Sequence, residues 1–160
     1  MPAESSALYP FGDMLALARQ SWLGAMSGRL AGRGYDDYRR SDAAALRLLR
    51  RGPVSVGRLG AVLGVTRQAA RKVADGLQQR GYVTTGRNPD DARQVDITLT
   101  PAGRDYARAI TAVIAELNRE VSLRTDPAKL AAADAVLRAV LFDDSTRQRA
   151  SRLPGPPAPR

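Results

Sequence analysis

A short run of hydrogen-bond donors in the middle of the chain carries the clearest chemistry. It comprises Thr66, Arg67, Gln68, Arg71 and Lys72. Arginine can donate two hydrogen bonds to guanine and glutamine can pair with adenine, whereas threonine and lysine can hold phosphate oxygens. These residue types are therefore suited to a DNA major groove. The same spacing is also typical of the solvated face of an amphipathic helix, so the pattern alone leaves both interpretations open.

A second charged stretch follows about twenty residues later along the chain. Arg87 and Arg93 flank a polar segment that contains Pro89, Asp90 and Asp91. An arginine can enter a narrow minor groove, where negative potential is concentrated. Asp91 could accept a hydrogen bond from the guanidinium of Arg93 and fix its direction. The alternative is an exposed ion pair, which contributes less than about 1 kcal/mol.

The elements around the first run predict a helix-turn-helix. Ser55 can cap one short helix, Gly64 is suited to the turn after it, and Thr66 can cap a second helix that reaches Arg80. Two short helices joined by a turn containing glycine are typical of this motif. We include Ser55 among the candidate DNA contacts.

The second charged stretch is predicted to be the tip of a β-hairpin. After Gly81 the apolar period changes, and residues 82–85 and 95–99 are the best strand candidates. The polar segment between them gives the hairpin a long tip, which would form a wing beside the helix-turn-helix. Thr100 and Pro101 then favour a new helix, since threonine can cap and proline is tolerated at the first helical position.

Apolar stripes predict helices at both ends of the chain. Residues 11–30 form a first helix, and residues 42–51 form a second one capped by Ser41. Beyond the hairpin, one stripe follows Pro101 for some twenty residues and another follows Asp126. The stripe after Pro101 is longer than a small core needs. Residues 145–160 lack periodicity and are predicted to be disordered.

Composition excludes several kinds of function. The 160 residues include neither Cys nor His, which removes disulfides, thiol redox sensing and metal sites built on those side chains. The acidic residues are scattered and no nucleophile has a His partner, so we expect neither an enzyme nor a cofactor. The net charge of +9 favours an acidic partner. With no signal peptide or membrane span in the sequence, we expect a cytoplasmic protein that makes no membrane contact.

Two stretches together resemble the MarR family of bacterial regulators. They are GPVSVGRLGAVLGVTRQAARKVADGLQQRGYV at residues 52–83 and NPDDARQVDITLTPAGR at residues 88–104. Residues 88–93 are similar to the family's Asp-Pro-x-Asp-x-Arg wing motif, with Asn88 in place of the first Asp. The resemblance implies that residues 66–72 read the major groove, that Arg93 enters the minor groove, and that Asp91 orients Arg93.

The resemblance also implies a fold that is mainly α with a small β-hairpin wing, a winged helix-turn-helix flanked by dimerisation helices. The expected regions are an N-terminal helix at 1–34, the DNA-binding domain at 35–104, C-terminal dimerisation helices at 105–144, and a disordered tail at 145–160. We expect the dimer interface to contain seven apolar residues: Phe11, Leu15, Ile110, Val113, Leu117, Leu137 and Leu141.

Members of the family bind small ligands in a cleft between the dimer helices and the DNA-binding lobe. Trp22, Met26, Tyr35 and Tyr38 could line such a cleft for a small aromatic or anionic ligand. The alternative is that Trp22 and Met26 are core residues and that Tyr35 and Tyr38 lie on a loop surface.

The sequence thus predicts a DNA-binding regulator, expected to be a repressor. It would bind a pseudo-palindromic operator on double-stranded DNA as a homodimer and be released by a small ligand. Two alternatives remain. One is a winged-helix module for protein interaction, and the other is non-specific DNA compaction, to which the Arg-rich tail would contribute.

Overall fold

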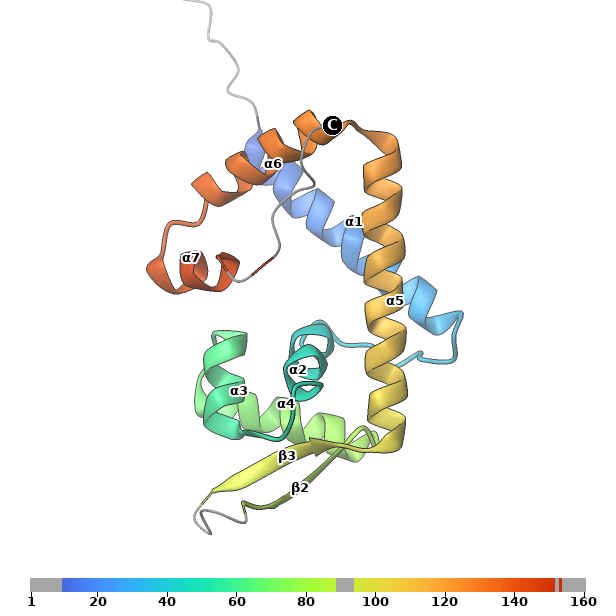
Figure 1. Ribbon diagram of the computed structural model, residues 1–160, viewed down its shortest axis with the longest axis vertical. Helices are drawn as coiled ribbons and strands as arrows, with labels where there is room; N and C mark the ends of the chain where they lie inside the picture. Colours follow the sequence, from blue (N-terminus) through green and yellow to red (C-terminus); the bar gives the residue numbers. More distant parts are fainter. Residues whose placement is uncertain (1–9, 89–93, 152, 154–160) are drawn as a thin grey trace, which may run out of the picture.

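The computed structural model describes residues 10–88, 94–151 and 153. The chain is mostly helical (68%) with a small three-stranded antiparallel sheet, which confirms the predicted fold class. In chain order the elements are α1 (Phe11–Ala31), α2 (Asp42–Leu49), β1 (Val54–Ser55), α3 (Val56–Leu63), α4 (Arg67–Gln79), β2 (Val83–Arg87), β3 (Val95–Leu99), α5 (Pro101–Arg124), α6 (Pro127–Ala139) and α7 (Asp144–Ala150). Helix α5 joins the helix-turn-helix and sheet at one end of the molecule to α1 and α6 at the other (Figure 1).

The winged helix-turn-helix is built from α2, α3, α4 and a sheet with strand order β1-β3-β2. Ile97 on the central strand pairs with Val54 on one side and Thr85 on the other. Gly64 ends α3 with a φ of 68°, in the left-handed region that favours glycine. Thr66 starts α4, because its side chain accepts a hydrogen bond from the Ala69 N–H at 3.2 Å. The predicted turn is confirmed.

One apolar core joins the sheet and the helices of this lobe to α1 and α5. Leu46, Leu59, Leu77 and Ile97, one each from α2, α3, α4 and β3, are all fully buried. Tyr106 extends this core onto α5. Such close packing fixes the orientation of α4 relative to the rest of the lobe.

Three residues expected at a dimer interface lie instead inside the single chain. Ile110, Val113 and Leu117 are 2%, 0% and 6% exposed, because their face of α5 is covered by the chain's own helices. Helix α5 contacts both α1 and α2. Arg29 also donates a hydrogen bond to Glu120 at 2.6 Å, linking α1 to α5. The prediction was wrong for these residues, since a helix stripe does not reveal which neighbour covers it.

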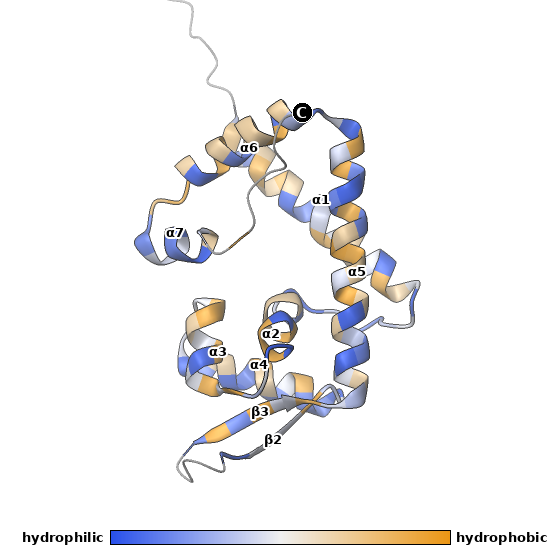
Figure 2. Ribbon diagram, in the orientation of Figure 1, coloured by the Kyte–Doolittle hydropathy of each residue, from blue (hydrophilic) through white to orange (hydrophobic). Residues whose placement is uncertain are grey.

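Apolar surface remains open at the other end of the molecule. None of the 13 residues of α6 is buried, and Leu137 on it is 46% exposed. Leu15 on α1 is 38% exposed, whereas Phe11 and Leu141 are half-buried. Figure 2 shows hydrophobic residues along α6. The described part of the chain contains no helix that is long and apolar enough to cross a membrane.

Two local predictions are corrected. Ser41 makes no side-chain cap to α2; instead the Asp42 carboxylate accepts a hydrogen bond from the Arg39 N–H at 2.9 Å. Residues 144–150 form α7, although we expected no regular structure from residue 145 onward. Helix α7 begins because Asp143 accepts a hydrogen bond from the Thr146 N–H at 2.8 Å, a local cap that apolar periodicity does not reveal.

Candidate nucleic-acid interface

A groove of about 750 Å³ runs between the start of α3, the first half of α4 and the start of β3. It brings together four of the predicted DNA contacts, namely Ser55, Arg67, Gln68 and Arg71. Thr66 and Lys72 are exposed on the same half of α4 or just before it. The groove therefore brings three side chains of α4 together with Ser55 at the end of β1.

These side chains point outward because the opposite face of α4 packs against the core. Ala70, Ala74 and Leu77 are completely buried against the core. Gly60 allows α3 to lie close to α4, since a Cβ at this position would be 3.1 Å from the Val65 carbonyl oxygen and 3.4 Å from the Ala70 Cβ. The sequence analysis did not single out Gly60, although a glycine inside a helix can mark such an approach.

The cations of the groove differ in their partners. Arg71 forms an ion pair with Asp75 at 3.2 Å, with the two side chains 59% and 46% exposed. An exposed pair of this kind contributes little stability, so a phosphate could replace the carboxylate. Among the residues that the structure describes, Arg67 and Lys72 form no ion pair. These cations are available to an anionic partner.

The base of the wing is held by Asp96 on β3. Its carboxylate accepts hydrogen bonds from the Asn88 side-chain amide at 2.8 Å and from the Gln94 side-chain amide at 3.3 Å. An aspartate at position 88 would place a second carboxylate beside that of Asp96, and the two would repel each other. This repulsion explains why an amide is favoured at position 88. Arg87 is exposed on β2. Asp91 and Arg93 lie outside the described residues.

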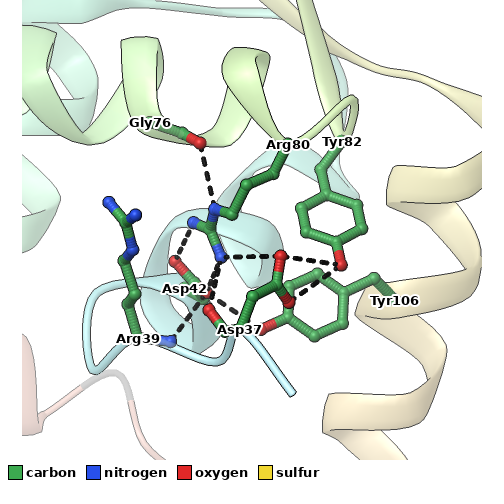
Figure 3. Close-up of polar contacts among 7 residues, drawn as sticks. All are labelled: Asp37, Arg39, Asp42, Gly76, Arg80, Tyr82 and Tyr106. Atoms are coloured by element: carbon green, nitrogen blue, oxygen red, sulfur yellow. Dashed lines mark hydrogen bonds and ion pairs between the residues drawn. The ribbon is translucent and has the colours of Figure 1, made fainter. Parts of the chain in front are cut away.

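A buried polar cluster, which the sequence analysis did not predict, lies at the other end of α4 (Figure 3). Asp42 at the start of α2 is 0% exposed. Its two carboxylate oxygens accept hydrogen bonds from Arg80 Nη1 and Nη2, both at 2.9 Å, and Tyr106 Oη donates a third at 2.9 Å. Arg80 also donates to the carbonyl oxygens of Gly76 at 3.0 Å and Asp37 at 2.9 Å. The cluster joins α2, α4, α5 and the loop before α2.

The charges of this cluster reinforce one another. The hydrogen bond to Asp42 raises the pKa of Arg80. Burial raises the pKa of Tyr106, and the neighbouring Asp42 carboxylate raises it further. Burial, followed by the hydrogen bond to Asp37, raises the pKa of Tyr82 to about 12. Both tyrosines therefore remain protonated donors at neutral pH.

Helical spacing contained a signal for the cluster. Asp42 precedes the buried Ala45 by three residues and Leu46 by four, which puts its carboxylate on the inward face of α2. Arg80 follows the buried Leu77 by three residues. Opposite charges on two inward faces favour a buried pair.

The sequence matches a known family in this same region. Residues 37–94 match a family model described as the MarR family, and these residues include α2, α3, α4 and the two outer strands β1 and β2. This part of the chain is similar to the MarR family. Members of the MarR family are DNA-binding transcriptional regulators rather than enzymes.

The chain is also similar to individual proteins and solved structures. An uncharacterized protein of Mycobacterium tuberculosis, Rv2011c, is 35% identical over 79 residues, which are 49% of this chain and 55% of the relative. The chain thus spans about half the length of the curated relatives it matches. A MarR mutant of Escherichia coli complexed with operator DNA has a similar fold, with a TM-score of 0.70 at 22% identity over 82% of this chain and 94% of that chain. BpsR of Bordetella bronchiseptica also has a similar fold, with a TM-score of 0.68 at 22% identity over 83% of this chain and 94% of that chain.

The structure corrects the ligand pocket that was expected from the sequence. Met26 is 1% exposed in the core, and Trp22 packs against that core, as the alternative interpretation held. Tyr35 is not a surface loop residue, because its ring stacks on Tyr106 with the centroids 4.8 Å apart. Tyr38 is half-buried and packs against the same core. Side chains already packed against one another cannot line an open cleft within one chain.

Proposed function

We propose that this chain is a sequence-specific repressor that binds a pseudo-palindromic operator as a homodimer. The observation that carries the proposal is the groove between α3, α4 and β3, which gathers Ser55, Arg67, Gln68 and Arg71 beside a hairpin wing. Arg67 and Gln68 would read base edges in the major groove, and Ser55 would hold a phosphate. In the similar MarR structure from E. coli, the protein is complexed with operator DNA.

The wing completes the proposed contact with DNA. Arg87 is exposed on β2. Arg93 would enter the minor groove and Asp91 would orient it, as the family motif implies. A narrow minor groove concentrates negative potential, and this potential attracts the guanidinium group of an arginine. The major-groove and minor-groove contacts together would fix the register of one half-site.

The proposed dimer rests on the apolar surface remote from the wing. Leu15 on α1 and Leu137 on α6 are exposed, together with Leu17, which is 59% exposed, and Phe142, which is 84% exposed. Apolar side chains gathered in this way are typical of an interaction surface. A twofold pairing through α1 and α6, with Phe11 and Leu141 at its edge, would cover them. Two recognition helices would then bind half-sites about one helical turn apart.

A small aromatic or anionic ligand would release the DNA by changing this separation. The DNA binding of the similar BpsR is regulated by 6-hydroxynicotinic acid. Because Met26 is buried in the single chain, a ligand site beside Trp22 and Tyr38 would need the second subunit to supply one wall.

Binding-site selection from random duplexes tests the proposal. The wild type should enrich a twofold-related consensus with half-sites about ten base pairs apart. The Arg67→Ala variant should lose the enrichment while remaining folded. The matched control is Arg119→Ala on the exposed side of α5, which removes the same charge outside the groove and should enrich the same consensus.

The second candidate function is non-specific compaction of DNA, which the net charge of +9 favours. It predicts salt-sensitive binding without any enriched sequence. A protein-interaction module would bind duplexes weakly, with affinity indifferent to Arg67 and Arg71.

A further inference from the structure

A second basic cleft lies away from the proposed DNA groove. It has a volume of about 550 Å³ and lies between α3 and the C-terminal helix α7. Arg51 after α2, Arg58 on α3 and Arg149 on α7 line it, together with Ser145 and Gln148. The lining thus brings together three guanidinium groups and two further polar side chains from segments far apart in the sequence.

The charge of this cleft is not balanced. No carboxylate lines it, and none of its three arginines forms an ion pair with another described residue. Arg149 donates to the Thr146 hydroxyl oxygen at 2.9 Å, a neutral group that does not balance its charge. The guanidinium groups between α3 and α7 therefore repel one another until an anion binds.

Close packing at Gly64 sets the position of Arg149. The guanidinium of Arg149 lies directly over the Gly64 Cα, and a Cβ at this position would collide with it. Arg149 is consequently half-buried against the turn that joins α3 to α4. An anion held by Arg58 and Arg149 would connect α7 to the helix-turn-helix.

We propose that this cleft binds a multiply charged phosphate group through Arg51, Arg58 and Arg149. Guanidinium groups bind phosphate with two parallel hydrogen bonds, and three of them suit an anion with more than one negative charge. The volume is within the range of small-ligand sites. The bound phosphate would hold α7 against α3. None of these arginines is among the proposed operator contacts, so the site is independent of the proposed function.

Pyrophosphate is the probe for the test. Isothermal titration calorimetry with the full chain at low ionic strength should show saturable binding. Arg58→Gln and Arg149→Gln should each raise the dissociation constant for pyrophosphate about tenfold, because each removes hydrogen bonds between charged groups. Arg119→Gln removes the same charge elsewhere and should bind like the wild type. Hydrogen exchange in residues 144–150 should slow when pyrophosphate is added to the wild type.

A second titration separates the two sources of phosphate. If the DNA backbone fills the cleft, saturation with a mixed-sequence duplex should block pyrophosphate binding, and Arg58→Gln should reduce the salt dependence of duplex binding. If a free phosphate compound fills the cleft, the duplex and pyrophosphate should bind to the protein at the same time. Circular dichroism melting checks that the variants are folded. The proposal is overturned if pyrophosphate does not bind, or if it binds the folded Arg58→Gln and Arg149→Gln variants as tightly as the wild type.

Discussion

Arginines at the two ends of α4 have contrasting surroundings. Arg80, just after the helix, has a side chain that is 11% exposed and holds the buried Asp42 carboxylate with two hydrogen bonds. Arg67 and Arg71 at the start of the helix are exposed, and the one carboxylate paired with Arg71 is itself open to solvent. The role of an arginine on this helix therefore depends on its surroundings and not on residue type alone. A buried carboxylate makes Arg80 structural, whereas its absence leaves Arg67 available to DNA.

The largest expected effect is on stability, at the buried end. Asp42→Ala should lower the free energy of unfolding by about 3–5 kcal/mol, because the buried Arg80 guanidinium would lose two hydrogen bonds to a carboxylate and would keep the weaker ion pair with Asp37 at 3.8 Å. Urea denaturation measures this change. The control is Asp75→Ala, which removes the exposed partner of Arg71 and should change stability by less than about 1 kcal/mol. Equal losses in the two variants would remove the distinction between the two ends of the helix.

At the exposed end the effect should fall on DNA affinity instead. Arg71→Ala should weaken binding of the selected operator by about 1–3 kcal/mol, which is the range for a lost contact to a base edge. Its free energy of unfolding should stay within about 0.5 kcal/mol of the wild type, as for other surface substitutions. Fluorescence anisotropy and urea denaturation measure the two quantities. A variant that loses stability but keeps its affinity would contradict the assignment.

The stability of the buried cluster should fall at alkaline pH, and Tyr82 is the group that tests this. Folding raises the pKa of Tyr82 from 10.0 to about 12, so the folded state favours the protonated phenol. The stability that this group contributes is fully present below pH 10 and is lost as the pH rises towards 12. Tyr82→Phe removes the titrating hydroxyl and should flatten the decline of the melting temperature over that interval. An unchanged slope would show that other groups control alkaline unfolding.

The smallest expected effect concerns the wing. Asn88→Asp should weaken the hairpin base modestly, because a carboxylate would replace the amide that donates to Asp96 at 2.8 Å. Position 88 lies diagonally across the hairpin from Asp96, which pairs with Gly86, so the cost should be below the roughly 1 kcal/mol of two like charges directly opposite one another. Hydrogen exchange of the β2 and β3 amides measures the loss. Asn88→Gln keeps a donor and should cost less; faster exchange in Asn88→Gln than in Asn88→Asp would contradict this explanation.

Sequence reasoning succeeded where local chemistry decides the structure. Thr66 and Thr100 cap helices as predicted, and Gly64 adopts the left-handed conformation that its turn requires. A cap or a turn depends on a few neighbouring residues, so its signal is contained in a short window.

Contacts between distant segments were harder to predict. Asp42 and Arg80 are 38 residues apart, and their pairing depends on how α2 packs beside α4. Likewise, the stripe through Val113 predicted burial correctly but not the neighbour, since the chain's own helices cover it. A helical period shows which face is covered and leaves open what covers it.

The most direct test compares the affinity for the selected operator with that for a scrambled duplex of equal length at one salt concentration. If the groove reads bases, the wild type should prefer the operator by about a thousandfold or more, and Arg67→Ala should lose most of that preference while its melting temperature is unchanged. If Arg67→Ala weakens both duplexes equally and keeps the preference, the groove contacts only the backbone and the central claim is wrong.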